Sequence, residues 1–261
     1  MQHIIELRDV AFSYPGSQRR ALDGCSFSID KGDLISILGP NGAGKSTLLN
    51  CACGLLRPQA GTVLLNGKDI ATLEQRDIAR AIGYVQQQQH STFAYSVFHY
   101  VLMGRAANIG LFRRPSKADE EVVWQVLDSM GLTRLADASV TQISGGERQQ
   151  AAIARAIVQD PQVVFFDEPT AHLDYGNQIN TLRLIAELRH RGFAVIMTTH
   201  NPDHCMMLGG KVAILDRDGH LEYGECADVV TEDRLEKVYN TQIRLTYIDE
   251  VKRVTCVPLG L

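Results

Sequence analysis

The chain has 261 residues, 45% of them hydrophobic, with a formal net charge of −4 at pH 7 and a sequence pI near 6.1. This length suffices for one large α/β domain or two lobes around a buried core. The slightly acidic balance lacks the basic surface that nucleic-acid binding needs, so nucleic acid is not an expected partner. The first six residues lack a signal-peptide pattern, and the longest apolar-leaning stretch, residues 93–104, is too short to span a bilayer, so we expect a cytoplasmic protein.

The amino-terminal part predicts short strands separated by turns, at residues 4–10, 25–29, 34–38 and 61–65. The last of these strands runs into the turn Asn66-Gly67, which is typical of a hairpin. Further along, the pattern predicts helices at 97–105, 118–130, 147–159 and 177–190, and buried strands at 163–166 and 194–198. Alternating strands and helices indicate a mostly parallel sheet that a helical insertion interrupts.

The third predicted strand leads into a glycine-rich loop, Gly39-Pro40-Asn41-Gly42-Ala43-Gly44-Lys45-Ser46-Thr47. Strand, loop and helix in this order form the context in which G-x-x-x-x-G-K-[ST] cradles phosphates. Glycines let backbone N–H groups converge on a triphosphate, and the helix N-terminus adds its dipole. We therefore predict a nucleoside triphosphate site, with Lys45 on the β- and γ-phosphates and Ser46 as a ligand of Mg²⁺.

A second functional pair, Asp167-Glu168, follows the apolar run at 163–166. In a phosphate-loop protein, the first carboxylate of such a pair holds Mg²⁺ through water, opposite Ser46. The second carboxylate can act as general base toward the attacking water.

Ser144-Gly145-Gly146-Glu147-Arg148 opens a predicted helix shortly before that pair. A serine hydroxyl, two glycines and a helix N-terminus can form an anion site. The same residues also describe an ordinary capped helix, in which Glu147 completes a capping box with Ser144. Only the order of the motifs along the chain separates these two interpretations.

Taken in order, these motifs resemble the ATP-binding subunit of ATP-binding-cassette (ABC) transporters over residues 3–225. The resemblance implies that Tyr14 stacks on adenine and that Gly39–Thr47 is the Walker A loop. It also implies a signature motif at Ser144–Arg148, the Walker B pair at Asp167-Glu168, a D-loop at Ala171–Asp174 and the switch histidine at His200.

The family fold implied is a P-loop NTPase (RecA-like) α/β core with an amino-terminal antiparallel β subdomain and an inserted α-helical subdomain. The chain is then a single nucleotide-binding domain over residues 1–261. We expect the core lobe at about 1–87 and 160–225, the helical lobe at about 88–159, and a C-terminal extension at about 226–261 in which we identify no motif.

Several positions depart from the family pattern. Ile143 and Glu147 replace the first and last residues of the usual Leu-Ser-Gly-Gly-Gln signature, and His172 stands where a small residue is common. The glutamine that senses Mg²⁺ usually follows a proline, so we take Gln87 as that residue, with Gln86 as the alternative.

The family mechanism implies two copies packed head to tail, so that Ser144, Gly145 and Gly146 of one copy complete the ATP site of the other. Glu168 then orients and deprotonates the attacking water, and His200 contacts the γ-phosphate. Lys45, Mg²⁺ and the partner's signature amides stabilise charge during hydrolysis.

The resemblance also implies two membrane-spanning permease subunits docking near residues 88–112, a segment rich in Phe, Tyr and Met. This segment resembles the metal-chelate importer branch. We expect import of an iron chelate (siderophore or haem), with molybdate, tungstate or cobalamin as alternatives. A substrate-binding protein would act indirectly, and the chain would lie on the inner face of the membrane through the permease. A soluble ABC ATPase outside transport is the alternative of another class.

Overall fold

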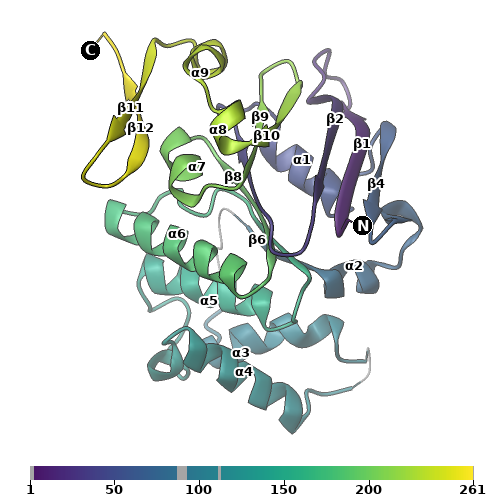
Figure 1. Ribbon diagram of the computed structural model, residues 1–261. Coiled ribbons are helices and arrows are strands. Elements are labelled where there is room, and N and C mark those ends of the chain that lie inside the picture. The colour runs from purple at the N-terminus through teal and green to yellow at the C-terminus, as the bar shows by residue number, and fades with distance from the viewer. Residues whose placement is uncertain (1–2, 87–92, 111–112, 261) are drawn as a thin grey trace. The chain divides into compact units, whose positions relative to one another are not determined.

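The computed structural model describes residues 3–86, 93–110 and 113–260 (Figure 1). The chain divides into two compact units, Met1–Leu73 with Leu188–Leu261, and Glu74–Glu187. Among the helices within the described ranges, none combines the length and the apolar character needed to cross a membrane.

An antiparallel sheet forms the amino-terminal part of the first unit. Its strand order is β2-β1-β4-β5, with β1 at Ile5–Phe12, β2 at Leu22–Ile29, β4 at Ala60–Leu65 and β5 at Lys68–Asp69. Asn66 and Gly67 both have positive φ, 50° and 75°, as a two-residue type I′ hairpin turn requires. The predicted hairpin is therefore confirmed, and the short helix η1 (Ile70–Thr72) follows it.

A second sheet of the first unit positions the phosphate loop. In it, β3 (Leu34–Leu38) is parallel to both β8 (Ala194–Thr199) and β9 (Lys211–Leu215), and β10 (Leu221–Glu225) is antiparallel to β9. Every residue of β3 and β8 is buried, as expected of central parallel strands. The chain leaves β3 at its carboxyl end and enters helix α1 (Lys45–Ala52).

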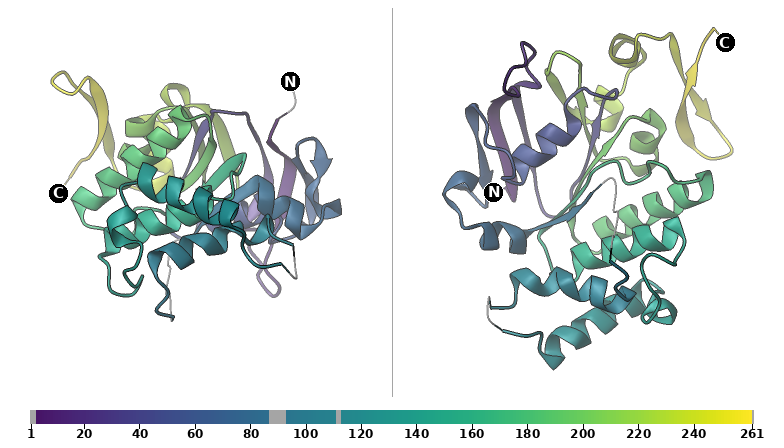
Figure 2. Two further views of the ribbon diagram at one scale, coloured as in Figure 1. Left: turned by 90° about the horizontal axis from the view of Figure 1, so that it is seen from below. Right: turned by 180° about the vertical axis from the view of Figure 1, so that it is seen from behind.

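Helix α7 (Pro202–Leu208) follows β8. Residues 226–260, part of the extension for which the sequence offered no motif, form two helices and a hairpin. The helices are α8 (Cys226–Val229) and α9 (Glu232–Tyr239), and the hairpin pairs β11 (Ile243–Ile248) with β12 (Arg253–Pro258) (Figure 2, yellow). Leu235 and Ile243 are buried in one hydrophobic cluster with Leu38 and Cys205. The C-terminal segment thus packs on β3, the strand that leads into the phosphate loop, and on helix α7.

The second unit contains a parallel strand pair and a group of helices. Its elements are α2 (Gln75–Ala81), β6 (Ile82–Val85), α3 (Val97–Leu102), η2 (Met103–Ala107), α4 (Lys117–Ser129), η3 (Thr133–Leu135), α5 (Gly145–Ile157), β7 (Val163–Phe166) and most of α6 (Tyr175–His190). Helices α3, α4 and α5 share one hydrophobic core (Figure 1). The expected class is confirmed: parallel strands, an amino-terminal antiparallel sheet and inserted helices.

One expected helix differs in shape. The predicted helix at 97–105 ends at Leu102 and continues as the tighter helix η2. A Cβ on Gly104 would lie within van der Waals overlap of the Arg155 carbonyl oxygen, 2.1 Å away, so only glycine permits this approach of η2 to α5.

Candidate functional site

The phosphate loop is held by close backbone contacts that two of its glycines permit. A Cβ on Gly39 would lie 2.4 Å from the Leu215 carbonyl oxygen, and one on Gly44 would lie 2.5 Å from the Ala21 carbonyl oxygen. Gly44 also has φ +112°, a conformation that other residues rarely adopt. The loop therefore requires glycine at both positions for steric reasons, independently of any bound phosphate.

Lys45 lies inside this loop. Its side chain is buried, with 5% exposed, and its ammonium donates hydrogen bonds to the carbonyl oxygens of Gly39 (2.9 Å) and Pro40 (3.1 Å). A buried ammonium at a helix N-terminus favours an anionic partner, because both the charge and the helix dipole attract negative groups. The residues present therefore fit a phosphate group.

Two further side chains border the loop. Tyr14 is 47% exposed, packs edge-on against Phe12 at 5.0 Å between ring centroids, and shares a hydrogen bond of 3.0 Å with the Thr47 hydroxyl. Its exposed ring is therefore anchored beside the loop, where an adenine could stack. Arg19 donates to the Gly42 carbonyl oxygen at 3.1 Å, a contact that sequence analysis missed because it depends on a loop distant in the chain.

The switch loop, residues 199–203, adjoins the phosphate loop. The Gly39 amide donates to the Thr199 carbonyl oxygen at 3.3 Å, so the residue before His200 is bonded to the first loop glycine. His200 is exposed, and its own carbonyl oxygen accepts a hydrogen bond of 2.9 Å from the Tyr239 hydroxyl. Asp203 accepts from the Thr255 hydroxyl and from the Cys256 amide, both at 2.9 Å. The C-terminal segment therefore holds the switch loop at two points.

His204, which directly follows the switch loop, has a structural role. It is buried, and its burial, with a smaller effect of the nearby His200, lowers its pKa and so favours the neutral imidazole. Its Nδ1 shares a hydrogen bond of 3.2 Å with the Thr199 hydroxyl.

The predicted carboxylate pair lies in the second unit, at the carboxyl end of β7. Asp167 is buried, and its amide donates to the Val85 carbonyl oxygen at 2.9 Å, continuing the parallel pairing of β7 with β6. Glu168 is half-buried and has φ +44°, in the left-handed region. Such a conformation costs a non-glycine residue about 1–3 kcal/mol and is typical of functional sites.

The predicted glutamine follows β6. Gln86 is exposed directly after Val85, whereas Gln87 lies outside the described residues. The choice between Gln87 and Gln86 therefore stays a prediction.

The signature residues form the first turn of α5. Ser144 is its N-cap, and Gly145 and Gly146 are its first two helical residues. The Glu147 carboxylate accepts from both the amide (3.0 Å) and the hydroxyl (2.8 Å) of Ser144, completing a capping box. Hydrogen bonds from Ser144, then one from Arg134, lower the pKa of Glu147 to about 2. The structure therefore shows the capped helix, and the anion site at the same residues stays a prediction.

Asn177, in the first turn of α6 directly after the predicted D-loop, lies against this helix turn. Asp174 accepts from the amide (2.8 Å) and the side-chain nitrogen (2.7 Å) of Asn177, and these bonds, the amide's first, lower the pKa of Asp174. A Cβ on Gly146 would lie 2.4 Å from the Asn177 side-chain oxygen. His172 is exposed and has φ +62°, in the left-handed region. Among small residues, only glycine would adopt this conformation more easily than histidine does.

The structure therefore groups the predicted residues by unit. The loop Gly39–Thr47, Tyr14 and His200 belong to the first unit; Ser144–Gly146 with Asp167-Glu168 belong to the second. Within the described ranges, no three His, Cys, Asp or Glu side chains gather to hold a metal ion.

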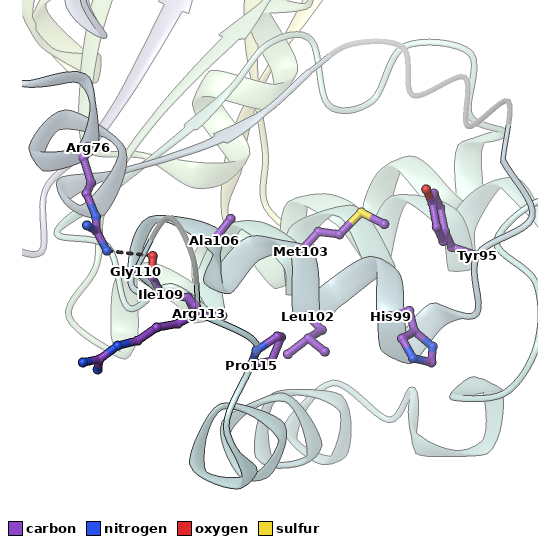
Figure 3. A pocket seen from close by; sticks show the side chains of 10 residues that line it. All are labelled: Arg76, Tyr95, His99, Leu102, Met103, Ala106, Ile109, Gly110, Arg113 and Pro115. Carbon is purple, nitrogen blue, oxygen red and sulfur yellow. Dashed lines mark hydrogen bonds between the residues drawn. The ribbon is translucent and has the colours of Figure 1, made fainter.

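The segment predicted to bind a membrane partner contributes to a pocket of the second unit, with a volume of about 610 Å³ (Figure 3). It is lined by Arg76, Tyr95, His99, Leu102, Met103, Ala106, Ile109, Gly110, Arg113 and Pro115. Arg76 forms one wall by donating to the carbonyl oxygens of Ala107 (2.9 Å) and Ile109 (2.7 Å). Tyr95 and Met103, each 41% exposed, present apolar surface at this pocket, and a pocket with a mostly apolar lining is a candidate binding surface.

Comparison with known proteins agrees with the motifs. A family model described as ABC transporter matches residues 22–171. The molybdate import ATP-binding protein MolC of Haemophilus influenzae is 34% identical over 241 residues, covering 92% of this chain and 89% of that protein. The ferric enterobactin transport ATP-binding protein FepC of Escherichia coli is 35% identical over 235 residues, covering 89% and 86%.

A solved structure of a metal-chelate type ABC transporter in an inward-facing conformation superposes with a TM-score of 0.88 at 32% identity, covering 100% of this chain and 98% of that one. The matched model spans more than half of the chain, and the relatives cover most of its length. The chain belongs to the ABC transporter family, as an ATP-binding subunit with ATPase activity.

Proposed function

We propose that the chain is the energy-coupling subunit of a prokaryotic importer for a metal chelate, with an iron chelate such as a siderophore or haem complex as cargo. The observation that carries this proposal is the apolar pocket lined by Tyr95, Met103 and their neighbours, in the segment where ABC subunits receive a membrane partner. The similarity to FepC and to a metal-chelate type transporter supports it. The similarity to MolC favours molybdate or tungstate as the alternative cargo, with cobalamin a further one.

Hydrolysis would use the residues of both units. Lys45, within the loop Gly39–Thr47, binds the phosphates while Tyr14 stacks on adenine. Glu168 deprotonates the attacking water, and His200 contacts the γ-phosphate. The burial of Lys45, the strained backbone at Glu168 and the bond between the two loops of the first unit support these roles.

Mg²⁺ would be held by Ser46, Asp167 and Gln87. Hydroxyl, carboxylate and amide oxygens are ligands that this ion accepts, and it commonly binds through one or two carboxylates plus phosphates rather than a larger protein cluster. The bound ion would neutralise charge on the β- and γ-phosphates. The site residues proposed for it therefore suit the ion chemically.

The partners would be a second copy and two permease subunits. Ser144, Gly145 and Gly146 of the second copy complete each ATP site, and the permeases dock near residues 88–112. A substrate-binding protein acts indirectly, and the complex places the chain at the inner face of the membrane. The core lobe would comprise residues 1–87 and 160–225, with the helical lobe at 88–159 and the extension at 226–261.

Uptake by a strain lacking this chain tests the proposal. Wild type should restore uptake of a radiolabelled iron chelate, whereas Glu168→Gln and Met103→Asp should not. Glu168→Gln slows hydrolysis about 10²-fold, and Met103→Asp places a charge in the pocket. Leu55→Asp is the matched control, since Leu55 is 60% exposed outside the pocket, and should restore uptake. Restored molybdate uptake alone would favour the alternative cargo. If neither uptake depends on the chain, a soluble ABC ATPase outside transport is favoured.

A further inference from the structure

In the first turn of the signature helix, the groups that could bind an anion already bind a carboxylate of the same turn, that of Glu147. The carboxylate of Glu147 accepts from the amide and the hydroxyl of Ser144, the groups through which a helix N-terminus binds anions. A glutamine at this position would bring no charge to the turn. In this chain, a phosphate approaching Ser144 would meet a carboxylate on the same turn.

The structure supplies a counter-ion for that carboxylate. Arg134, from helix η3, donates through Nη2 to Oε1 of Glu147 at 2.5 Å, while Oε2 faces Ser144. The two carboxylate oxygens are thus divided between the guanidinium and the serine. The Arg134 side chain is 67% exposed and that of Glu147 is 23% exposed, so the pair lies at the surface that an approaching molecule would meet.

We propose that Arg134 is a positioning residue for the ATPase reaction: it neutralises and holds Glu147, so that Ser144 can receive the γ-phosphate of ATP bound to a second copy. This inference rests on the proposed head-to-tail arrangement. Arg134 acts through Glu147 and does not itself touch the nucleotide.

An ordinary surface ion pair is the competing explanation. Exposed pairs contribute little to stability, because water screens them and ordering two side chains costs entropy. Under that explanation, loss of Arg134 would change neither stability nor ATP use. Under our proposal, it leaves stability intact and weakens the response to ATP, because an unneutralised carboxylate repels the triphosphate.

The test compares ATPase kinetics of wild type with Arg134→Ala, Glu147→Gln and the double variant. Arg134→Ala should raise KM for ATP about five-fold, the effect of one unscreened unit charge near 4 Å in water, with kcat changed much less. The increase should grow as ionic strength falls, since salt screens exposed charges. In the Glu147→Gln background, Arg134→Ala should have no effect, and Arg134→Lys should restore the wild-type KM in part.

Arg8→Ala is the matched control, because Arg8 forms an exposed pair with Glu6 at 2.8 Å in the first unit. It should leave KM unchanged. An unchanged KM in Arg134→Ala overturns the inference, and so does an increase that persists with Glu147→Gln, since Arg134 would then act without Glu147. Ser144→Ala distinguishes failure of this inference from failure of the proposed function. If that variant also keeps wild-type kinetics, the proposed role of the signature residues fails, and not only the role of Arg134.

Discussion

Replacing Gly39 by alanine tests whether steric contact between β3 and β9 shapes the phosphate loop. The added Cβ would lie 2.4 Å from the Leu215 carbonyl oxygen and 3.4 Å from its carbonyl carbon. Leu215 ends β9, which pairs with β3 directly before Gly39. The clash is with the backbone of Leu215, so relief requires a shift of the strand or of the loop.

Overpacking of this kind costs about 1–3 kcal/mol. For a chain of this size, each kcal/mol lowers Tm by about 2–4 °C, so we expect a decrease of about 2–12 °C. A displaced loop also loses at least one amide donor to phosphate, and a hydrogen bond to a charged group is worth about 1.5–3 kcal/mol. Nucleotide affinity should therefore fall about ten-fold or more.

Thermal unfolding and nucleotide titration measure both effects on the same sample. Gly176→Ala is the control, because its Cβ would lie 3.5 Å from the Asp174 carboxylate oxygen, an ordinary contact, and the residue is helical. It should keep or slightly raise Tm. If Gly39→Ala unfolds and binds nucleotide like wild type, the steric reasoning about the loop is wrong.

Three further predictions follow from the sites. Glu168→Gln should bind ATP normally and hydrolyse it about 10²-fold more slowly, and a normal rate would exclude Glu168 as general base. Tyr239→Phe removes the hydrogen bond to the His200 carbonyl oxygen. The kcat should therefore fall about two- to ten-fold, the effect expected from the net free energy of one hydrogen bond, while nucleotide affinity stays unchanged. An unaltered kcat would show that this bond does not orient the switch loop. The folded-state pKa of Glu147 is about 2, below its ordinary 4.5, so its carboxylate stabilises the fold above pH 4.5 and this contribution disappears as the pH falls toward 2. The Tm difference between wild type and Glu147→Gln should therefore shrink over that acidic range, and a difference that stays constant would contradict the capping interaction.

Local patterns predicted the elements that carry the phosphate chemistry. The runs Leu34–Leu38 and Val163–Phe166 are fully buried in the structure, as uninterrupted apolar stretches of this length indicate. The glycine-rich loop Gly39–Thr47 follows the first run and the carboxylates Asp167-Glu168 follow the second, and each of these patterns has a chemical reason. Such information is contained in a few neighbouring residues, so sequence alone can supply it.

The contacts that sequence missed join residues far apart in the chain. Arg19 reaches Gly42, Tyr239 reaches His200, and Thr255 reaches Asp203, and no local pattern specifies these pairs. The hairpin of β11 and β12 was missed for another reason: all but one of its strand residues are partly buried or exposed, so its apolar alternation is weak.

Mixing two inactive variants tests the central claim, that Ser144 serves the ATP site of a second copy. Lys45→Ala removes the phosphate contact of one chain, and Ser144→Ala removes the signature hydroxyl of the other. If two copies pack head to tail, a mixed dimer keeps one intact site, formed by Lys45 of one chain and Ser144 of its partner. An equimolar mixture should then hydrolyse ATP at about a quarter of the wild-type rate, because half of the dimers are mixed and each has one intact site. A mixture no more active than the sum of its two components would contradict the account.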